Sequence, residues 1–272
     1  MSQAEKETIS VLRAAIGKKY VLTDQQSLEF YSMDVYRSFE IPIAVVQPGS
    51  VEELQEVVRV ATGLGMAIVA RGGGASYTDG YLPTTPKSIT IDTSRLNKIV
   101  EINEEDMFVT VESGVTWAEM AAALAEKNLR TPFWGPFSGL KATIGGSSSQ
   151  NSLSMGTSAY GGSPESILCY DIVLPSGEIL KTGSSSMENS SAFFRHYGPD
   201  LTGLFSGDSG ALGVKARITL RLIKLPTHTL TSSFGFKDYA SMSEGMAAAA
   251  REQSASSNWG LDPKLQQGQL GS

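Results

Sequence analysis

The chain has 272 residues, of which 41% are hydrophobic and 18% charged, as is typical of a globular protein with one large domain or two moderate ones. A formal net charge of −6 argues against nucleic acid or an anionic membrane as a partner, because both need a basic face. The single cysteine, Cys169, excludes an intrachain disulfide framework. Because it lies in an apolar run, we expect a buried, inert thiol.

No apolar stretch approaches the roughly 20 residues that are needed to cross a bilayer. The polar N-terminus contains no signal-peptide core, and the single cysteine suits a reducing compartment. These features predict a cytoplasmic protein without a transmembrane segment. Peripheral attachment to a membrane through a partner stays open.

The first strong pattern is a β-α-β unit. Residues 43–46 predict a short buried strand, and Ser50 and Glu53 then predict a capping box, in which Glu53 reaches back to the N–H of Ser50. Apolar residues at helical spacing follow, and residues 66–70 predict a second apolar strand. This strand continues directly into a Gly-rich loop at 71–80.

The rest of the chain predicts an α+β fold with long loops. The strands expected after the Gly-rich loop span residues 88–92, 98–102, 108–112, 167–174 and 216–223. Thr116 and Glu119 predict a second capping box and helix, whereas residues 131–163 lose all periodicity. Residues 237–256 are rich in Ala, Ser and Met, which is typical of a flexible tail or of the first part of a further domain.

The loop at 71–80 has the chemistry of an anion site. Three adjacent glycines, Gly72 to Gly74, let successive backbone N–H groups converge on a pyrophosphate, while Ser76 adds a hydroxyl and Arg71 a charge. No long helix can start after these glycines, so the loop is not a Rossmann fingerprint. It also lacks the Gly-Lys-Ser/Thr of a P-loop. The alternative is a tight structural turn.

Two later segments are also rich in glycine. The first runs from Thr143 through Gly156 to Gly162, and it predicts either a disordered linker or a functional loop. Aromatic residues and prolines flank it and a strand follows, so a functional loop is favoured. The second segment, residues 200–214, ends in a strand and again offers backbone to a ligand, although a simple loop before an edge strand would look the same.

In their order and spacing, six segments of the sequence resemble the FAD-binding domain of the vanillyl-alcohol oxidase and p-cresol methylhydroxylase (PCMH-type) flavoproteins. The pattern is most similar to the branch of the glycolate oxidase D-subunit and D-lactate dehydrogenase. The segments are Val46–Pro48 with its helix, Arg71–Gly80, Gly114–Trp117, Thr143–Gly146, Asp171–Glu178 and Leu204–Val214.

The resemblance implies a PCMH-type domain of two α+β subdomains over residues 42–226. An N-terminal helical segment, 1–41, would precede it. Residues 227–272 would be a tail, or the start of a missing substrate or cap domain.

The resemblance also implies a set of residues that bind FAD. The first loop would hold the pyrophosphate, the second segment the flavin and ribityl portion, and the third the adenine end. The expected residues are Arg71, Gly72, Gly73, Gly74, Ala75, Ser76, Tyr77, Gly80, Pro136, Thr143, Ile144, Gly145, Gly146, Ser149, Gly156, Gly213 and Val214.

Many members of the family attach the flavin covalently through a histidine. Only His196 and His228 are present, and neither lies in the first loop or in the 143–161 segment, so non-covalent FAD is expected. Because no carboxylate orients either histidine in the sequence, no catalytic residue is assigned. No metal site is expected.

The implied function is an FAD-dependent oxidoreductase, or its flavin domain, that oxidises an alcohol or a 2-hydroxy acid such as glycolate or D-lactate by hydride transfer to FAD. In the family, the substrate-binding half follows this domain. The alternative is a flavin electron-transfer subunit of a multi-subunit dehydrogenase. A non-enzymatic protein that binds another pyrophosphate ligand is a third reading. The expected partners are a small-molecule substrate and an electron acceptor or partner subunit.

Overall fold

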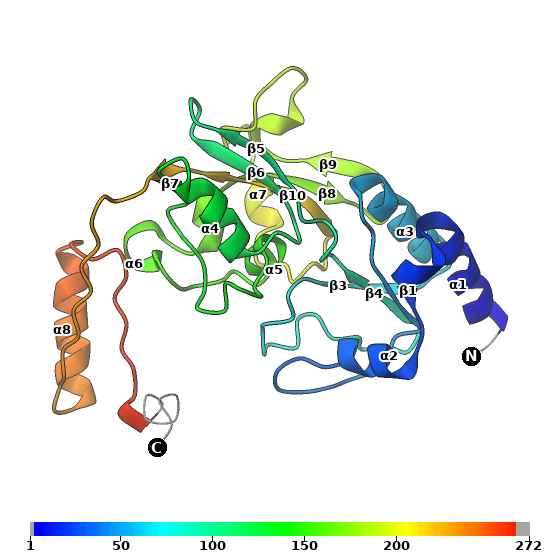
Figure 1. Cartoon of the computed structure of the whole chain (residues 1–272), viewed down its shortest axis with the longest axis horizontal. Helices are drawn as coiled ribbons and strands as arrows, with labels where there is room; N and C mark the ends of the chain where they lie inside the picture. The colour runs from blue at the N-terminus through cyan, green and yellow to red at the C-terminus, as the bar shows by residue number, and fades with distance from the viewer. Residues whose placement is uncertain (1–2, 265–272) are drawn as a thin grey trace.

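The N-terminal third of the chain builds a small sheet that is covered by helices (Figure 1). The computed structural model describes residues 3–264. The four strands have the order β1-β2-β4-β3, with β1 antiparallel to β2 and the other pairs parallel. The elements are α1 (Gln3–Ile16), the 3₁₀ helix η1 (Lys18–Tyr20), β1 (Val21–Leu22), α2 (Gln25–Tyr31), β2 (Ala44–Val46), α3 (Val51–Gly63), β3 (Ala67–Arg71) and β4 (Ser88–Asp92).

The β-α-β unit predicted from the sequence is confirmed as β2-α3-β3. Ser50 caps α3 by accepting a hydrogen bond from the N–H of Glu53. The reciprocal half of the predicted capping box is wrong, because the Glu53 carboxylate accepts from the N–H of Gly49 at 2.7 Å. The carboxylate thus satisfies a free donor one residue earlier in the turn. Both halves of the second box, between Thr116 and Glu119, are present.

Helix α1 shares the core of this sheet, although it precedes the β-α-β unit. Ile9, Leu12 and Ile16 lie in one hydrophobic cluster with Leu54 of α3 and Ile89 of β4. Helices α1 and α3 therefore bury their apolar faces together.

We expect Leu12→Ala to lower the free energy of unfolding by about 2–5 kcal/mol, because it leaves a cavity at a side chain with 0% exposure. Chemical denaturation measures this loss. Val11→Ala, at a position with 41% exposure on the same helix, is the matched control and should cost far less. A small effect of Leu12→Ala would show that α1 is dispensable for the core.

Residues 99–221 build a five-stranded antiparallel sheet in the order β5-β6-β10-β8-β9. Helix α4 packs on one face through Trp117, Met120 and Leu124, and the Trp117 ring meets Phe133 edge-on at 5.1 Å. The elements are β5 (Ile99–Asn103), β6 (Phe108–Glu112), α4 (Trp117–Ala125), β8 (Ile167–Val173), β9 (Ile179–Lys181) and β10 (Val214–Arg221).

Residues 131–163 are not wholly irregular, so the prediction of a continuous loop is wrong there. Thr143 caps a short helix, α5 (Ile144–Ser149), and buried Ile144 anchors it to the core. Tertiary packing thus overrides the poor helix propensity of a Gly- and Ser-rich sequence. The remaining short elements are β7 (Leu129–Arg130), α6 (Thr157–Tyr160), η2 (Ser163–Ser166), η3 (Gly183–Ser186), α7 (Leu201–Leu204) and β11 (Ile223–Lys224), which pairs with β7.

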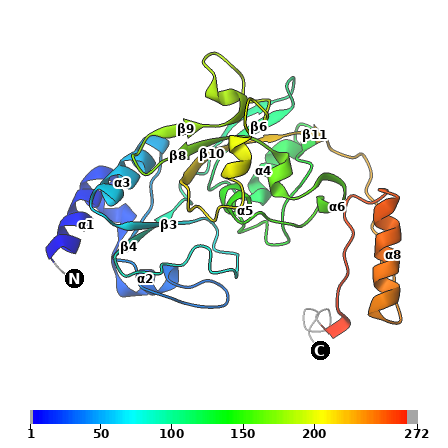
Figure 2. The same cartoon turned by 180° about the vertical axis from the view of Figure 1, so that it is seen from behind.

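The C-terminal part stands apart from the two sheets. After β11 the chain is extended, and helix α8 (Tyr239–Arg251) then lies beside the body, as both views show (Figures 1 and 2). The chain returns to the body where Ser257 accepts from the N–H of Gly156 and Trp259 packs on Phe137. The predicted segment 227–272 extends beyond the described residues from 265 onward. No helix within residues 3–264 is long and apolar enough to cross a membrane.

Candidate functional site

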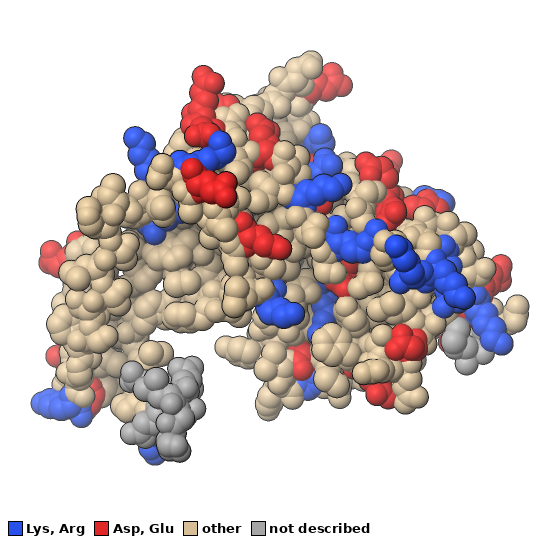
Figure 3. Space-filling model, viewed as in Figure 1, with Lys and Arg blue, Asp and Glu red and all other residues tan. Residues whose placement is uncertain are grey.

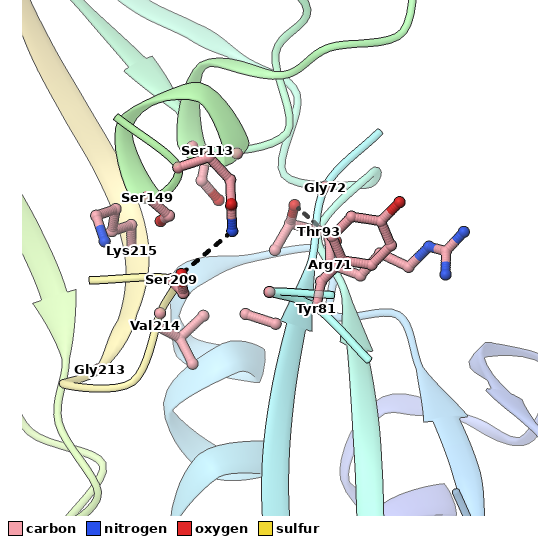
Figure 4. A pocket seen from close by; sticks show the side chains of 16 residues that line it. Arg71, Gly72, Tyr81, Thr93, Ser113, Ser149, Ser209, Gly213, Val214 and Lys215 are labelled. Carbon is pink, nitrogen blue, oxygen red and sulfur yellow. Dashed lines mark hydrogen bonds between the residues drawn. The ribbon is translucent and has the colours of Figure 1, made fainter. Parts of the chain in front are cut away.

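The three Gly-rich segments meet at a pocket between the two sheets (Figure 4). The pocket encloses about 470 Å³, part of it open to solvent. Each of the three segments contributes to its wall. Of the residues expected from the sequence, those in the wall are Arg71, Gly72, Gly80, Gly145, Gly146, Ser149, Gly213 and Val214.

The other expected residues are not part of this wall. Gly73 to Tyr77 continue the first loop from Gly72. Thr143 caps α5, and Ile144 is a core residue with 1% exposure. Pro136 and Gly156 belong to a different pair of loops, which are joined by a bridge between Gly135 and Met155. The structure therefore does not bring Pro136 and Gly156 into the pocket wall.

The first loop has a run of free backbone donors. Within residues 3–264, no acceptor is hydrogen-bonded to the N–H groups from Gly72 to Thr78, whereas the next N–H, of Asp79, has a partner. Gly74 has a φ of +63°, a left-handed conformation that glycine adopts without strain. Consecutive free N–H groups around such a residue form an anion-binding concavity. This is the feature that a pyrophosphate requires.

Gln150 connects all three Gly-rich segments. The sequence did not predict it as a residue of the site. Its Oε1 accepts from the Thr78 hydroxyl of the first loop at 2.7 Å. Its Nε2 lies 3.4 Å from the Ser209 hydroxyl of the third segment, the contact drawn in Figure 4. The N–H of Ser209 also donates to the carbonyl of Ser149. The three segments are thus joined by side-chain and backbone hydrogen bonds.

Ser113 places an unused hydroxyl in the pocket wall. It follows β6 directly, has 2% exposure, and its Oγ has no hydrogen-bond partner among the described residues. A buried polar atom without a partner is costly unless a ligand or water satisfies it. Its position next to Gly114, in one of the segments that carry the family resemblance, is a signal that sequence reading missed.

Arg71 does not direct its charge into the pocket. Its Nη1 donates to the carbonyl of Met33 at 2.7 Å, and the guanidinium lies against the rings of Tyr31 and Tyr81. Figure 4 shows the side chain extending away from Ser149 and Lys215. Burial lowers the pKa of the Arg71 guanidinium, an effect opposed by the charges around it. The backbone end of Arg71 thus lines the pocket, whereas its side chain faces α2.

A buried ion pair closes the opposite side of the pocket. Lys215 of β10 contacts the Asp208 carboxylate at 2.6 Å, and the two side chains are only 2% and 3% exposed. Asp208 also accepts from the N–H groups of Gly210 and Leu212. Burial lowers the pKa of Lys215, and the Asp208 carboxylate opposes that shift. The pair therefore fixes the 208–215 turn that presents Gly213 and Val214 to the pocket.

His196 and His228 are exposed and lie outside the pocket wall. His228 is within hydrogen-bond distance of its neighbour Thr227, and His196 lies near the Phe194 ring. Cys169 is buried at 2% exposure, as predicted.

Comparison with known proteins agrees with the family resemblance found in the sequence. The family described as "FAD binding domain" matches residues 42–183, more than half of the chain. The mitochondrial D-lactate dehydrogenase [cytochrome] of Arabidopsis thaliana is 30% identical over 237 residues, which are 86% of this chain and 40% of that protein. Glycolate oxidase subunit GlcD of Bacillus subtilis (strain 168) is 29% identical over 197 residues, which are 72% of this chain and 40% of that protein.

Among solved structures, p-cresol methylhydroxylase with substrate bound superposes with a TM-score of 0.77 at 23% identity. The match covers 92% of this chain and 49% of that one. This structural match confirms the predicted PCMH-type α+β fold. The chain spans less than half the length of the relatives that it matches.

Proposed function

The chain belongs to the FAD binding domain family, and from that premise we propose that it is the flavin-binding part of an oxidoreductase acting on an alcohol or a 2-hydroxy acid. The predicted resemblance to the glycolate oxidase and D-lactate dehydrogenase branch is confirmed. The cofactor is FAD. When bound, it supplies the acceptor for the electrons of the oxidised hydroxyl carbon.

The observation that carries the proposal is the convergence of the three Gly-rich segments on one pocket beside the free N–H groups of residues 72–78. These donors would hold the pyrophosphate. The Ser113 hydroxyl, which has no partner among the described residues, would donate a hydrogen bond to the same ligand. Residues Gly145 and Gly146 of α5 and residues Gly213 and Val214 would line the remainder. Arg71 would act through its backbone.

We propose that FAD is held without a covalent bond, since neither histidine lies in the pocket wall. Pro136 and Gly156 remain proposed FAD contacts, in loops that the C-terminal segment contacts through Ser257 and Trp259. The hollow between α8 and the body is largely free of charged side chains in the space-filling view (Figure 3).

The substrate class is proposed from the relatives, which are named for D-lactate and glycolate. Because the chain aligns with 40% of each, we place the substrate-binding residues in additional chain or in a partner subunit. We keep residues 42–226 as the FAD-binding domain, 1–41 as a helical segment before it, and 227–272 as a tail or the start of a substrate domain. A cytoplasmic location, with its single cysteine kept as a thiol, is part of the same proposal.

Addition of FAD to the purified chain tests the function directly. We expect absorption bands at about 370 and 450 nm that remain with the protein after gel filtration, because the pocket retains the flavin. Absence of retained flavin would contradict the FAD proposal. Dye reduction is then measured with D-lactate and glycolate as donors.

Reduction by this chain alone would contradict the proposal that the substrate half lies elsewhere. FAD retention without dye reduction fits that proposal and also fits an electron-transfer subunit. The name "subunit" of the Bacillus subtilis relative favours this second candidate. The same dye-reduction assay on a chain as long as the full-length relatives distinguishes the two candidate functions, because only a dehydrogenase then reduces the dye.

A further inference from the structure

The segment after α2 lies against the Gly-rich loop, although it precedes the region that matches the family. Residues 32–39 form a tight turn, in which the N–H of Asp34 donates to the carbonyl of Arg37 at 2.8 Å. Asp34 Oδ1 accepts from the N–H groups of Tyr36 and Arg37 at 2.6 and 2.7 Å. One carboxylate oxygen thus fixes the shape of this turn, and the other is free to bind elsewhere.

The second oxygen of Asp34 reaches the cofactor loop. Asp34 Oδ2 accepts from the N–H of Asp79 at 3.2 Å, and Arg37 contacts the Asp79 carboxylate at 3.5 Å. Asp79 has a φ of +62°, a conformation that an L-residue rarely adopts and that must be held by its surroundings. The next residue, Gly80, is part of the pocket wall.

Helix α2 also holds the two strands that end at the pocket. The Tyr31 hydroxyl donates to Asp92 at the end of β4 at 2.6 Å. Arg71, at the end of β3, donates to the carbonyls of Tyr31 and Met33. Asp92 and Arg71 are register partners, and the residues that follow them, Thr93 and Gly72, lie in the pocket wall. The same short segment therefore contacts the pocket's two adjoining strand ends as well as its loop.

Resting on the proposed FAD site, we propose that residues 31–37 form a clamp that positions the Gly-rich loop for FAD, with Asp34 as its central positioning residue. The carboxylate joins two turns that are 45 residues apart in sequence. Although partial burial alone would raise the pKa of Asp34, the N–H groups of Arg37, Tyr36 and Asp79 lower it below its ordinary value, because these hydrogen bonds stabilise the ionised carboxylate. Asp34 touches the loop, and FAD binding depends on it indirectly.

Asp34→Ala tests the clamp, with FAD titration and hydrogen exchange as readouts. We expect FAD affinity to fall by about tenfold or more, because charge-assisted hydrogen bonds that order the loop are lost. Asp34→Asn keeps only one acceptor oxygen, so it can accept from the turn or from the N–H of Asp79 but not from both, and its FAD affinity should lie between those of the wild type and Asp34→Ala. Asp238→Ala removes another aspartate that accepts backbone hydrogen bonds, at the N-cap of α8 far from the pocket, and should leave FAD affinity unchanged.

Hydrogen exchange on the FAD-free protein separates the clamp from the proposed function. The Asp79 amide is hydrogen-bonded to Asp34, so Asp34→Ala should speed exchange in peptides covering residues 79–82, and Asp34→Asn, with a single acceptor oxygen, should speed it to a smaller extent. If the wild-type chain retains no FAD, the FAD proposal fails while this exchange still decides whether the clamp exists. Unchanged exchange in Asp34→Ala, or wild-type FAD affinity in that variant, would overturn the clamp.

Discussion

Gly73→Val is expected to abolish FAD retention while the two sheets remain folded. A Cβ at residue 73 would lie 1.6 Å from the backbone carbonyl oxygen of Lys141, so the loop and the 141–143 segment must move apart. That movement misplaces the free N–H groups that we assign to the pyrophosphate. Loss of two hydrogen bonds to a charged group, at about 1.5–3 kcal/mol each, weakens binding by about 100-fold or more. Flavin absorbance after gel filtration measures retention.

Gly63→Val is the matched control for this experiment. Gly63 ends α3, and a Cβ added there meets no atom within 4 Å. This variant should retain FAD like the wild type, and circular dichroism should show that both variants are folded. Wild-type FAD affinity in Gly73→Val would mean that the loop is only a tight turn, the alternative left open by the sequence.

Lys215→Ala is expected to lower the free energy of unfolding by about 3–5 kcal/mol, because it leaves the Asp208 carboxylate buried without its partner. The turn that Asp208 holds through Gly210 and Leu212 should loosen as well, so FAD affinity should also fall. Urea denaturation and FAD titration measure the two effects. The double variant Asp208→Asn/Lys215→Met removes both charges and should recover much of the stability.

Lys127→Ala provides the comparison at the surface. Lys127 pairs with Glu104, but the side chains are 40% and 55% exposed, so its loss should cost less than about 1 kcal/mol. If Lys215→Ala costs no more than Lys127→Ala, the buried pair does not hold the third segment in place.

The sequence alone predicted much of the fold because the signals are local. Apolar runs, helical spacing and caps lie within a few residues of each other, and they located β2, α3, β3 and α4. The errors are also local. Glu53 satisfies Gly49 instead of Ser50, and a Gly-rich stretch forms α5 because Ile144 packs into the core.

Six short segments also identify the family without the structure, because their order is specific even when each segment is weak. Only the tertiary structure decided which side chains face the pocket. Arg71 turns toward α2, whereas Ser113, Gln150 and Lys215 enter the wall, and Asp34 reaches Asp79. The physical reason is that these contacts join residues far apart in the chain. Their directions follow from how β3, β4, β6 and β10 meet, which no local pattern records.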